Sequence, residues 1–213
     1  MASTIEKTTS FTDCSPQSAD NSLKTTSVDS RYSDPDLLIR EYFLSSSAQR
    51  AKLRKLIFKK IKSWQSVLAI LAWSRRKEIS DAYDGAVDLL AECTDIHLLQ
   101  NATKYLESTS LLWGASSSNI ASWSSLDDFW EVLIKGIACT YKIPAQERFK
   151  LILNLFSVSK RRSTKAVIID ALVILSDEID SQTIQDAISL FSSPHEPDLY
   201  IRNYANEALQ EIF

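Results

Sequence analysis

Apolar residues near the end of the chain recur with the 3.6-residue period of an α-helix. Within residues 198–213 they occupy relative positions 0, 3, 4, 7, 8 and 11, namely Ile201, Tyr204, Ala205, Ala208, Leu209 and Ile212. The same six-position pattern occurs 37 residues earlier, at Thr164, Val167, Ile168, Ala171, Leu172 and Leu175. The spacing therefore predicts two amphipathic helices of one type.

Each of these helices follows another predicted helix with its own repeated pattern. The first copy has Phe149, Ile152, Leu153 and Phe156, and the second has Ile184, Ala187, Ile188 and Phe191, 35 residues later. The pattern predicts two helix–loop–helix units of about 36 residues. One such unit cannot bury both faces of its helices, so we expect neighbouring units to stack.

The rest of the pattern is helical but less regular. We expect eight or nine helices in all, one of them long and bent near Ser63. Before the two units, the expected helices begin at Pro35 and span residues 48–73, 81–93, 96–107 and 126–141. Residues 108–124 fit no helical pattern, because Gly114 and nearby serines interrupt it, and we expect a short helical turn there, packed by Trp113 and Trp123.

The first 33 residues differ from the remainder in composition. Thirteen of the first thirty are Ser or Thr, and large apolar residues are almost absent. Such a segment buries too little surface to offset the entropy lost on ordering. We expect a disordered tail over residues 1–33 and a single all-helical domain over 34–213, where Asp34 caps the first helix and Pro35 begins it.

Composition strengthens the helical prediction. The 213 residues include only 3 Gly and 5 Pro, so few positions suit the tight turns that a β-rich fold requires. With 45% hydrophobic and 24% charged residues, the chain has the make-up of an ordinary globular protein. The predicted fold class is all-α.

Charge divides the chain into a basic block and an acidic body. Residues 45–77 hold ten Lys or Arg and no acid, whereas residues 78–213 hold twenty acids and ten bases. A second, smaller basic cluster lies near residues 160–165. Our candidates for binding a partner or a phosphate are Arg50, Lys52, Arg54, Lys55, Lys59, Lys62, Lys160, Arg161 and Arg162, together with Trp113 and Trp123.

Catalytic and metal-binding motifs are lacking in the sequence. The two histidines, His97 and His195, have no partner at metal-ligand spacing, and three scattered glycines do not form a phosphate-binding loop. We therefore expect no cofactor and no enzymatic activity. The three cysteines are far apart, which indicates a reducing compartment, and we expect a cytoplasmic protein without a signal peptide or transmembrane segment.

Residues 198–212, DLYIRNYANEALQEI, resemble the second helix of a HEAT or armadillo-type repeat. Ile201 and Arg202 match the Val-Arg pair of this family, and its core positions are matched by Ala205, Ala208, Leu209 and Ile212. The earlier copy departs from the pattern, because Thr164 and Lys165 replace the pair and no Asp precedes it. The resemblance covers residues 145–213 well and residues 34–142 only in topology.

The resemblance implies an irregular HEAT-like α-solenoid of antiparallel helix pairs. Members of this family are mostly protein-binding scaffolds; a minority bind nucleic acid, and a few are bilin lyases or DNA glycosylases. It also implies that Asp198 and Arg202 hold neighbouring repeats together. If residues 198–213 form the last helix of the stack, its outer face should be polar, and Asn203, Asn206, Glu207 and Gln210 fit that requirement.

Three hypotheses about function remain open at this point. The leading one is a non-enzymatic protein–protein interaction adaptor or regulatory scaffold. The alternative is a nucleic-acid-binding protein that uses the basic clusters 50–62 and 160–165, since Lys and Arg bind phosphates. The third is a HEAT-like lyase or glycosylase. If the two basic clusters share one face, nucleic acid is favoured; if they do not, the adaptor is favoured.

Overall fold

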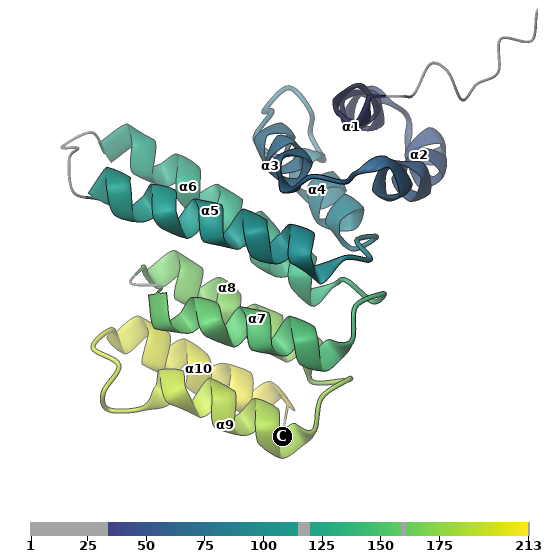
Figure 1. Cartoon of the computed structure of the whole chain (residues 1–213). Helices are drawn as coiled ribbons and strands as arrows, with labels where there is room; N and C mark the ends of the chain where they lie inside the picture. Colours follow the sequence, from purple (N-terminus) through teal and green to yellow (C-terminus); the bar gives the residue numbers. More distant parts are fainter. Residues whose placement is uncertain (1–33, 115–119, 159–160, 213) are drawn as a thin grey trace, which may run out of the picture. The chain divides into compact units, whose positions relative to one another are not determined.

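The computed structural model is all-helical over the residues it describes (Figure 1). These are residues 34–114, 120–158 and 161–212; the expected N-terminal tail lies outside them. The all-α prediction is confirmed, and the expected number of eight or nine helices was too low. The helices are α1 Pro35–Leu44, α2 Ser47–Lys60, α3 Trp64–Trp73, α4 Ala82–Leu90, α5 Ile96–Gly114, α6 Ile120–Ala138, α7 Ala145–Val158, α8 Arg162–Leu175, α9 Ser181–Ser192 and α10 Leu199–Ile212.

The start of α1 agrees with its sequence signature. Asp34 has extended backbone angles, its side chain accepts a hydrogen bond from the amide of Asp36, and Pro35 is the first helical residue. An N-terminal amide without an intrahelical partner is satisfied in this way. The predicted cap is therefore confirmed.

The single helix that we expected over residues 48–73 is in fact two helices. Ile61 leaves the helical conformation with a ψ angle of 122°, and Ser63 caps α3 by accepting a hydrogen bond from the amide of Gln65. The hydroxyl of Ser63 thus starts a new helix and does not merely bend the old one. Ile61 stays buried at this break, with 2% of its surface exposed.

The irregular segment 108–124 also differs from the prediction of one short helical turn. It contains the end of α5, which continues to Gly114, and the beginning of α6 at Ile120. Ser108 and Thr109 are helical, and their hydroxyls donate hydrogen bonds to the carbonyl of Tyr105, one turn earlier. The side chains of Trp113 and Trp123 lie outside the described residues.

The later helices pair along the chain and then contact the next pair. α5 packs on α6, α7 on α8, and α9 on α10, and Figure 1 shows these pairs in successive layers. Contacts of α6 with α8, and of α8 with α10, join the layers. At the other end, α1 packs on α2 and α3, while α3 and α4 pack on α5 and α6, respectively.

The repeated apolar positions face the core. All six positions of the α8 pattern are buried, and in α10 Ile201, Ala205 and Ala208 are buried while the other three pack against the core. The rings of Phe156 in α7 and Phe191 in α9, which are equivalent positions of the two units, have centroids 4.4 Å apart. The predicted polar outer face of α10 is confirmed, because Asn203, Asn206, Glu207 and Gln210 are exposed.

Arg148 is the largest fully buried side chain of the described core, with 1% of its surface exposed. Its guanidinium donates hydrogen bonds to the carbonyls of Ile143 and Ala138, and it forms an ion pair with Glu178 in the segment before α9. A buried guanidinium is tolerated only with such partners. Arg148 therefore holds together the end of α6, the start of α7 and the segment between α8 and α9.

Candidate functional site

Apart from the half-buried Lys60, the basic residues of α2 fall into two sets on opposite sides of the helix. We call the exposed set the lysine face; it consists of Lys52, Lys55, Lys59 and, just beyond the helix, Lys62. The buried residues Leu53 and Ile57 lie on the other side, toward the core. Among the ion pairs of the described residues, none involves a member of the lysine face. Its charge is therefore not neutralised by the described fold.

Arg50 belongs to the inward set and acts as a structural residue. Its guanidinium donates to the carbonyls of Tyr42 and Phe43 at the end of α1, at 3.0 and 2.9 Å. It also pairs with Asp81, at 2.5 Å, and its side chain is only 14% exposed. The hydrogen bond from Arg50 lowers the pKa of Asp81 below its ordinary value. Arg50 is thus committed to fixing α1 against α2 and the start of α4.

Arg54 is committed in the same way. It lies 3.4 Å from Asp88 and 3.2 Å from Glu92, whose side chain is 3% exposed. Glu92 also pairs with Lys142. Burial acts to raise the pKa of Glu92, but the hydrogen bond and charge of Lys142, with the charge of Arg54, hold it below its ordinary value. Arg50 and Arg54 were candidates for binding a partner, but in the structure both form ion pairs with carboxylates of this chain.

The acids that neutralise these arginines were not singled out in the sequence. Asp81, Asp88 and Glu92 are spaced by seven and four residues, which places them on one face of a helix, and Arg50 and Arg54 are four residues apart. This matching periodicity was the available signal.

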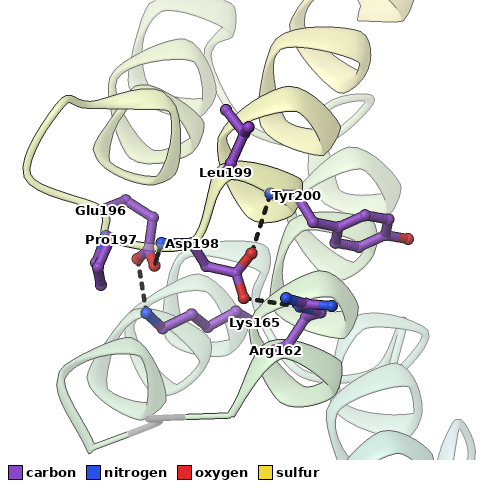
Figure 2. Close-up of a pocket in the computed structure, with 7 residues that line it drawn as sticks. All are labelled: Arg162, Lys165, Glu196, Pro197, Asp198, Leu199 and Tyr200. Carbon is purple, nitrogen blue, oxygen red and sulfur yellow. Dashed lines mark hydrogen bonds and ion pairs between the residues drawn. The ribbon is translucent and has the colours of Figure 1, made fainter.

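The second basic cluster adjoins a pocket formed by the start of α8 and the segment that leads into α10. We call it the α8–α10 pocket. Its volume is about 450 Å³ and its lining consists of Arg162, Lys165, Glu196, Pro197, Asp198, Leu199 and Tyr200 (Figure 2). Of the sequence candidates, only Arg162 lines it; Arg161 is half-buried nearby, and Lys160 lies outside the described residues.

Two ion pairs cross this pocket. The ammonium of Lys165 lies 2.6 Å from Glu196, and Nε of Arg162 lies 2.7 Å from Asp198 (Figure 2). Asp198 also accepts a hydrogen bond from the amide of Tyr200 and so caps the first turn of α10. The hydrogen bond from Arg162 lowers the pKa of Asp198. Both cations are matched by carboxylates, so the pocket carries little net charge.

The outer rim of the pocket is apolar and aromatic. Leu199 and Tyr200 are adjacent in the sequence and are 61% and 52% exposed. The guanidinium of Arg162 lies over the ring of Tyr200, 5.4 Å from its centroid, and Tyr200 stacks on Tyr204 at 6.0 Å. Tyr204 is itself fixed by a hydrogen bond to Asp170 of α8. The exposed ring of Tyr200 is therefore held in one orientation.

Asp198 and Arg202, which we expected to join neighbouring repeats, behave differently from each other. Asp198 joins the segment before α10 to α8 through Arg162. Arg202 is half-buried, and its Nε has no hydrogen-bond partner within the described part of the chain. Lys165, at the position equivalent to Arg202 in the earlier copy of the pattern, pairs with Glu196.

Other functional groups are not brought together by the fold. Within residues 34–114, 120–158 and 161–212, no three His, Cys, Asp or Glu side chains are grouped so that they could hold a metal ion. Burial raises the pKa of the Cys93 thiol to about 11, so this thiol is protonated near neutral pH. None of the described helices has the length and apolarity to cross a membrane.

The two basic clusters belong to different parts of the helical array. α2 makes its main contacts with α1, whereas α8 packs on α6, α7, α9 and α10. The lysine face and the α8–α10 pocket also differ in chemistry, since one is an uncompensated row of ammonium groups and the other an ion-paired aromatic surface. Comparison of the chain with protein-family models, with curated proteins and with solved structures finds no match.

Proposed function

We propose that this chain is a non-enzymatic protein-binding adaptor built on HEAT-like helical repeats. The support for the repeats is the spacing of 35 to 37 residues, together with the contact between the equivalent residues Phe156 and Phe191. Pairs α7–α8 and α9–α10 would be two such repeats, arranged as antiparallel helix pairs in a solenoid. The free thiols Cys93 and Cys139 fit a reducing compartment such as the cytoplasm.

The observation that carries the proposal is the rim of the α8–α10 pocket. Protein interfaces are enriched in Tyr and Arg at their centres, surrounded by polar groups that exclude water. Tyr200, Arg162 and Leu199 supply such a centre, and the ion pairs of Lys165 and Arg162 supply the polar surroundings. Because Tyr200 is fixed between Arg162 and Tyr204, little side-chain entropy would be lost on binding.

The two other hypotheses fit this pocket less well. Nucleic acid would require unpaired cations, but Arg162 and Lys165 are each matched by a carboxylate. A lyase or glycosylase would require an unpaired acid or base in a cavity, and Glu196 and Asp198 are both held by cations. The lysine face of α2 has no such counter-charges among the described residues.

Affinity capture with paired variants tests the proposal. The tagged chain is compared with Leu199→Ser/Tyr200→Ala, and captured proteins are identified by mass spectrometry. Leu190→Ser/Tyr105→Ala is the matched control, because it removes one Leu and one Tyr that are 50% and 44% exposed elsewhere. We expect a partner that the control retains and the pocket variant loses, and that binds the purified chain directly. A set of partners retained by all three proteins contradicts the proposal.

A further inference from the structure

The lysine face is an uncompensated row of ammonium groups on a chain that is otherwise acidic. Lys52, Lys55, Lys59 and Lys62 are all exposed, and the surrounding sequence, residues 45–77, contains no acid at all. Asp81, Asp88 and Glu92, which lie in or beside α4, are paired with Arg50 and Arg54 on the opposite side of α2. Nothing in the described fold accounts for four ammonium groups in a row.

We propose that the lysine face binds the sugar–phosphate backbone of nucleic acid without reading its sequence. At 1.5 Å per residue, Lys52 and Lys59 are about 10 Å apart along the axis of α2. Ammonium groups on flexible stems over that length can reach several phosphates of a duplex, which carries one charge per roughly 1.7 Å. This surface is distinct from the α8–α10 pocket, and the proposal does not depend on the proposed function.

The composition of the face favours a phosphate backbone over a protein partner. Lys is depleted at protein interfaces, where Arg and aromatic residues dominate. In α2 the arginines are used internally, and the exposed positions other than lysine are Ser47, Ala48, Gln49 and Ala51. This face therefore offers neither an apolar anchor for a protein nor an aromatic ring on which a base could stack. Contacts of lysine to phosphate position a protein without selecting sequence.

A membrane surface is the other polyanion that a basic helix can bind, and α2 lacks the means. Interfacial helices bury an apolar face in the bilayer. The large apolar residues of α2, namely Leu53, Leu56, Ile57 and Phe58, are buried in the protein core or packed against it. With no free apolar face, α2 would have only electrostatic attraction to lipid head groups.

Fluorescence anisotropy with the full chain and a labelled mixed-sequence DNA duplex of about 20 base pairs tests this inference, in salt from about 20 to 200 mM. Four phosphate contacts predict a slope of log K against log salt of about −3.6. We expect Lys55→Gln/Lys59→Gln to reduce this slope to about −1.8 and to weaken binding about tenfold at the lowest salt. Lys104→Gln/Lys150→Gln, which removes two exposed lysines from α5 and α7, is the control with the same net charge and should leave both values unchanged.

Two further probes decide between the polyanions. Poly-glutamate of similar charge and vesicles containing phosphatidylserine are measured under the same conditions. We expect both to bind more weakly than the duplex. The inference is overturned if the duplex does not bind at about 20 mM salt, if the control variant loses as much affinity as the lysine-face variant, or if either probe binds as tightly as the duplex.

Discussion

The ammonium of Lys165 in α8 lies 2.6 Å from the carboxylate of Glu196, in the segment before α10, and both side chains are nearly buried, at 12% and 4% exposed. The same carboxylate accepts a hydrogen bond from the amide of Asp198, where α10 is capped. This contact joins the two repeated units at the base of the α8–α10 pocket. It positions the segment before α10 against α8 and shapes the pocket.

Replacing Glu196 with Gln should destabilise the protein by about 3 kcal/mol, because it leaves the ammonium of Lys165 without a counter-charge in a nearly buried position. Urea denaturation followed by far-ultraviolet circular dichroism measures the change. Glu207→Gln on the exposed face of α10 is the control and should change stability by less than about 0.5 kcal/mol. The double variant Lys165→Met/Glu196→Leu should recover most of the loss; equal instability of the double and single variants would show that the pair is not the cause.

Arg148→Met should cost about 3–5 kcal/mol, since the carbonyls of Ala138 and Ile143 lose their buried donor. Lys150→Met on the exposed side of the same helix should be nearly neutral. Glu178→Gln should cost only about 1 kcal/mol, because Glu178 is 46% exposed and the two carbonyl contacts persist. Thermal and urea unfolding compare the three variants, and equal losses for Arg148→Met and Glu178→Gln would contradict the importance of the carbonyl contacts.

Two helical glycines should respond oppositely to alanine. A Cβ atom at Gly136 would lie 2.7 Å from the side chain of Leu90, so Gly136→Ala should destabilise the α4–α6 contact by about 1–3 kcal/mol. At Gly85 the nearest atoms are 3.6 Å away, an ordinary contact, so Gly85→Ala should be neutral or stabilise α4 by up to about 1 kcal/mol. In thermal unfolding, Gly136→Ala should lower the melting temperature, whereas Gly85→Ala should leave it unchanged or raise it.

The stabilising effect of Glu92 should depend on pH in a definite direction. Its pKa is lowered in the folded chain from an ordinary value of 4.5 by Lys142 and Arg54, despite burial. A carboxylate with a depressed pKa contributes stability above its unfolded pKa and loses it as pH falls through the folded pKa. The difference in unfolding free energy between the native chain and Glu92→Gln should therefore be constant above about pH 5.5 and shrink below about pH 4.5. A difference that grows on acidification would contradict this assignment.

Local signals in the sequence were enough to predict the helical class and much of the core. The start of α1 at Pro35 and the paired patterns of α7 to α10 were predictable because capping and period depend only on neighbouring residues. The break between α2 and α3 was not, because the apolar stripe continues across Ile61, which stays buried whether or not the chain is helical there. The extension of α5 to Gly114 was missed because serine and glycine oppose helix only weakly when tertiary contacts favour it.

The candidate site was predictable only in part, because charge density does not reveal pairing. From the sequence, the seven cations from Arg50 to Lys62 formed one group. The fold divides them, because Arg50 pairs with Asp81, just before α4, and Arg54 pairs with Glu92, just after it. From the sequence, Arg162 was expected to be free to bind a partner, although Asp198, 36 residues later, lies beside it. Leu199 and Tyr200 were overlooked because their exposure depends on how α10 packs, which no local pattern specifies.

Site-specific photo-crosslinking tests the central claim, binding of a protein at the α8–α10 pocket, most directly. A benzophenone amino acid is placed at Tyr200 on the pocket rim and, as the matched control, at Asn206 on the exposed outer face of α10. Irradiation in the source cells should yield a discrete covalent adduct with one protein from position 200 and none from position 206. Adducts of the same pattern from both positions, or none from position 200, would contradict the claim.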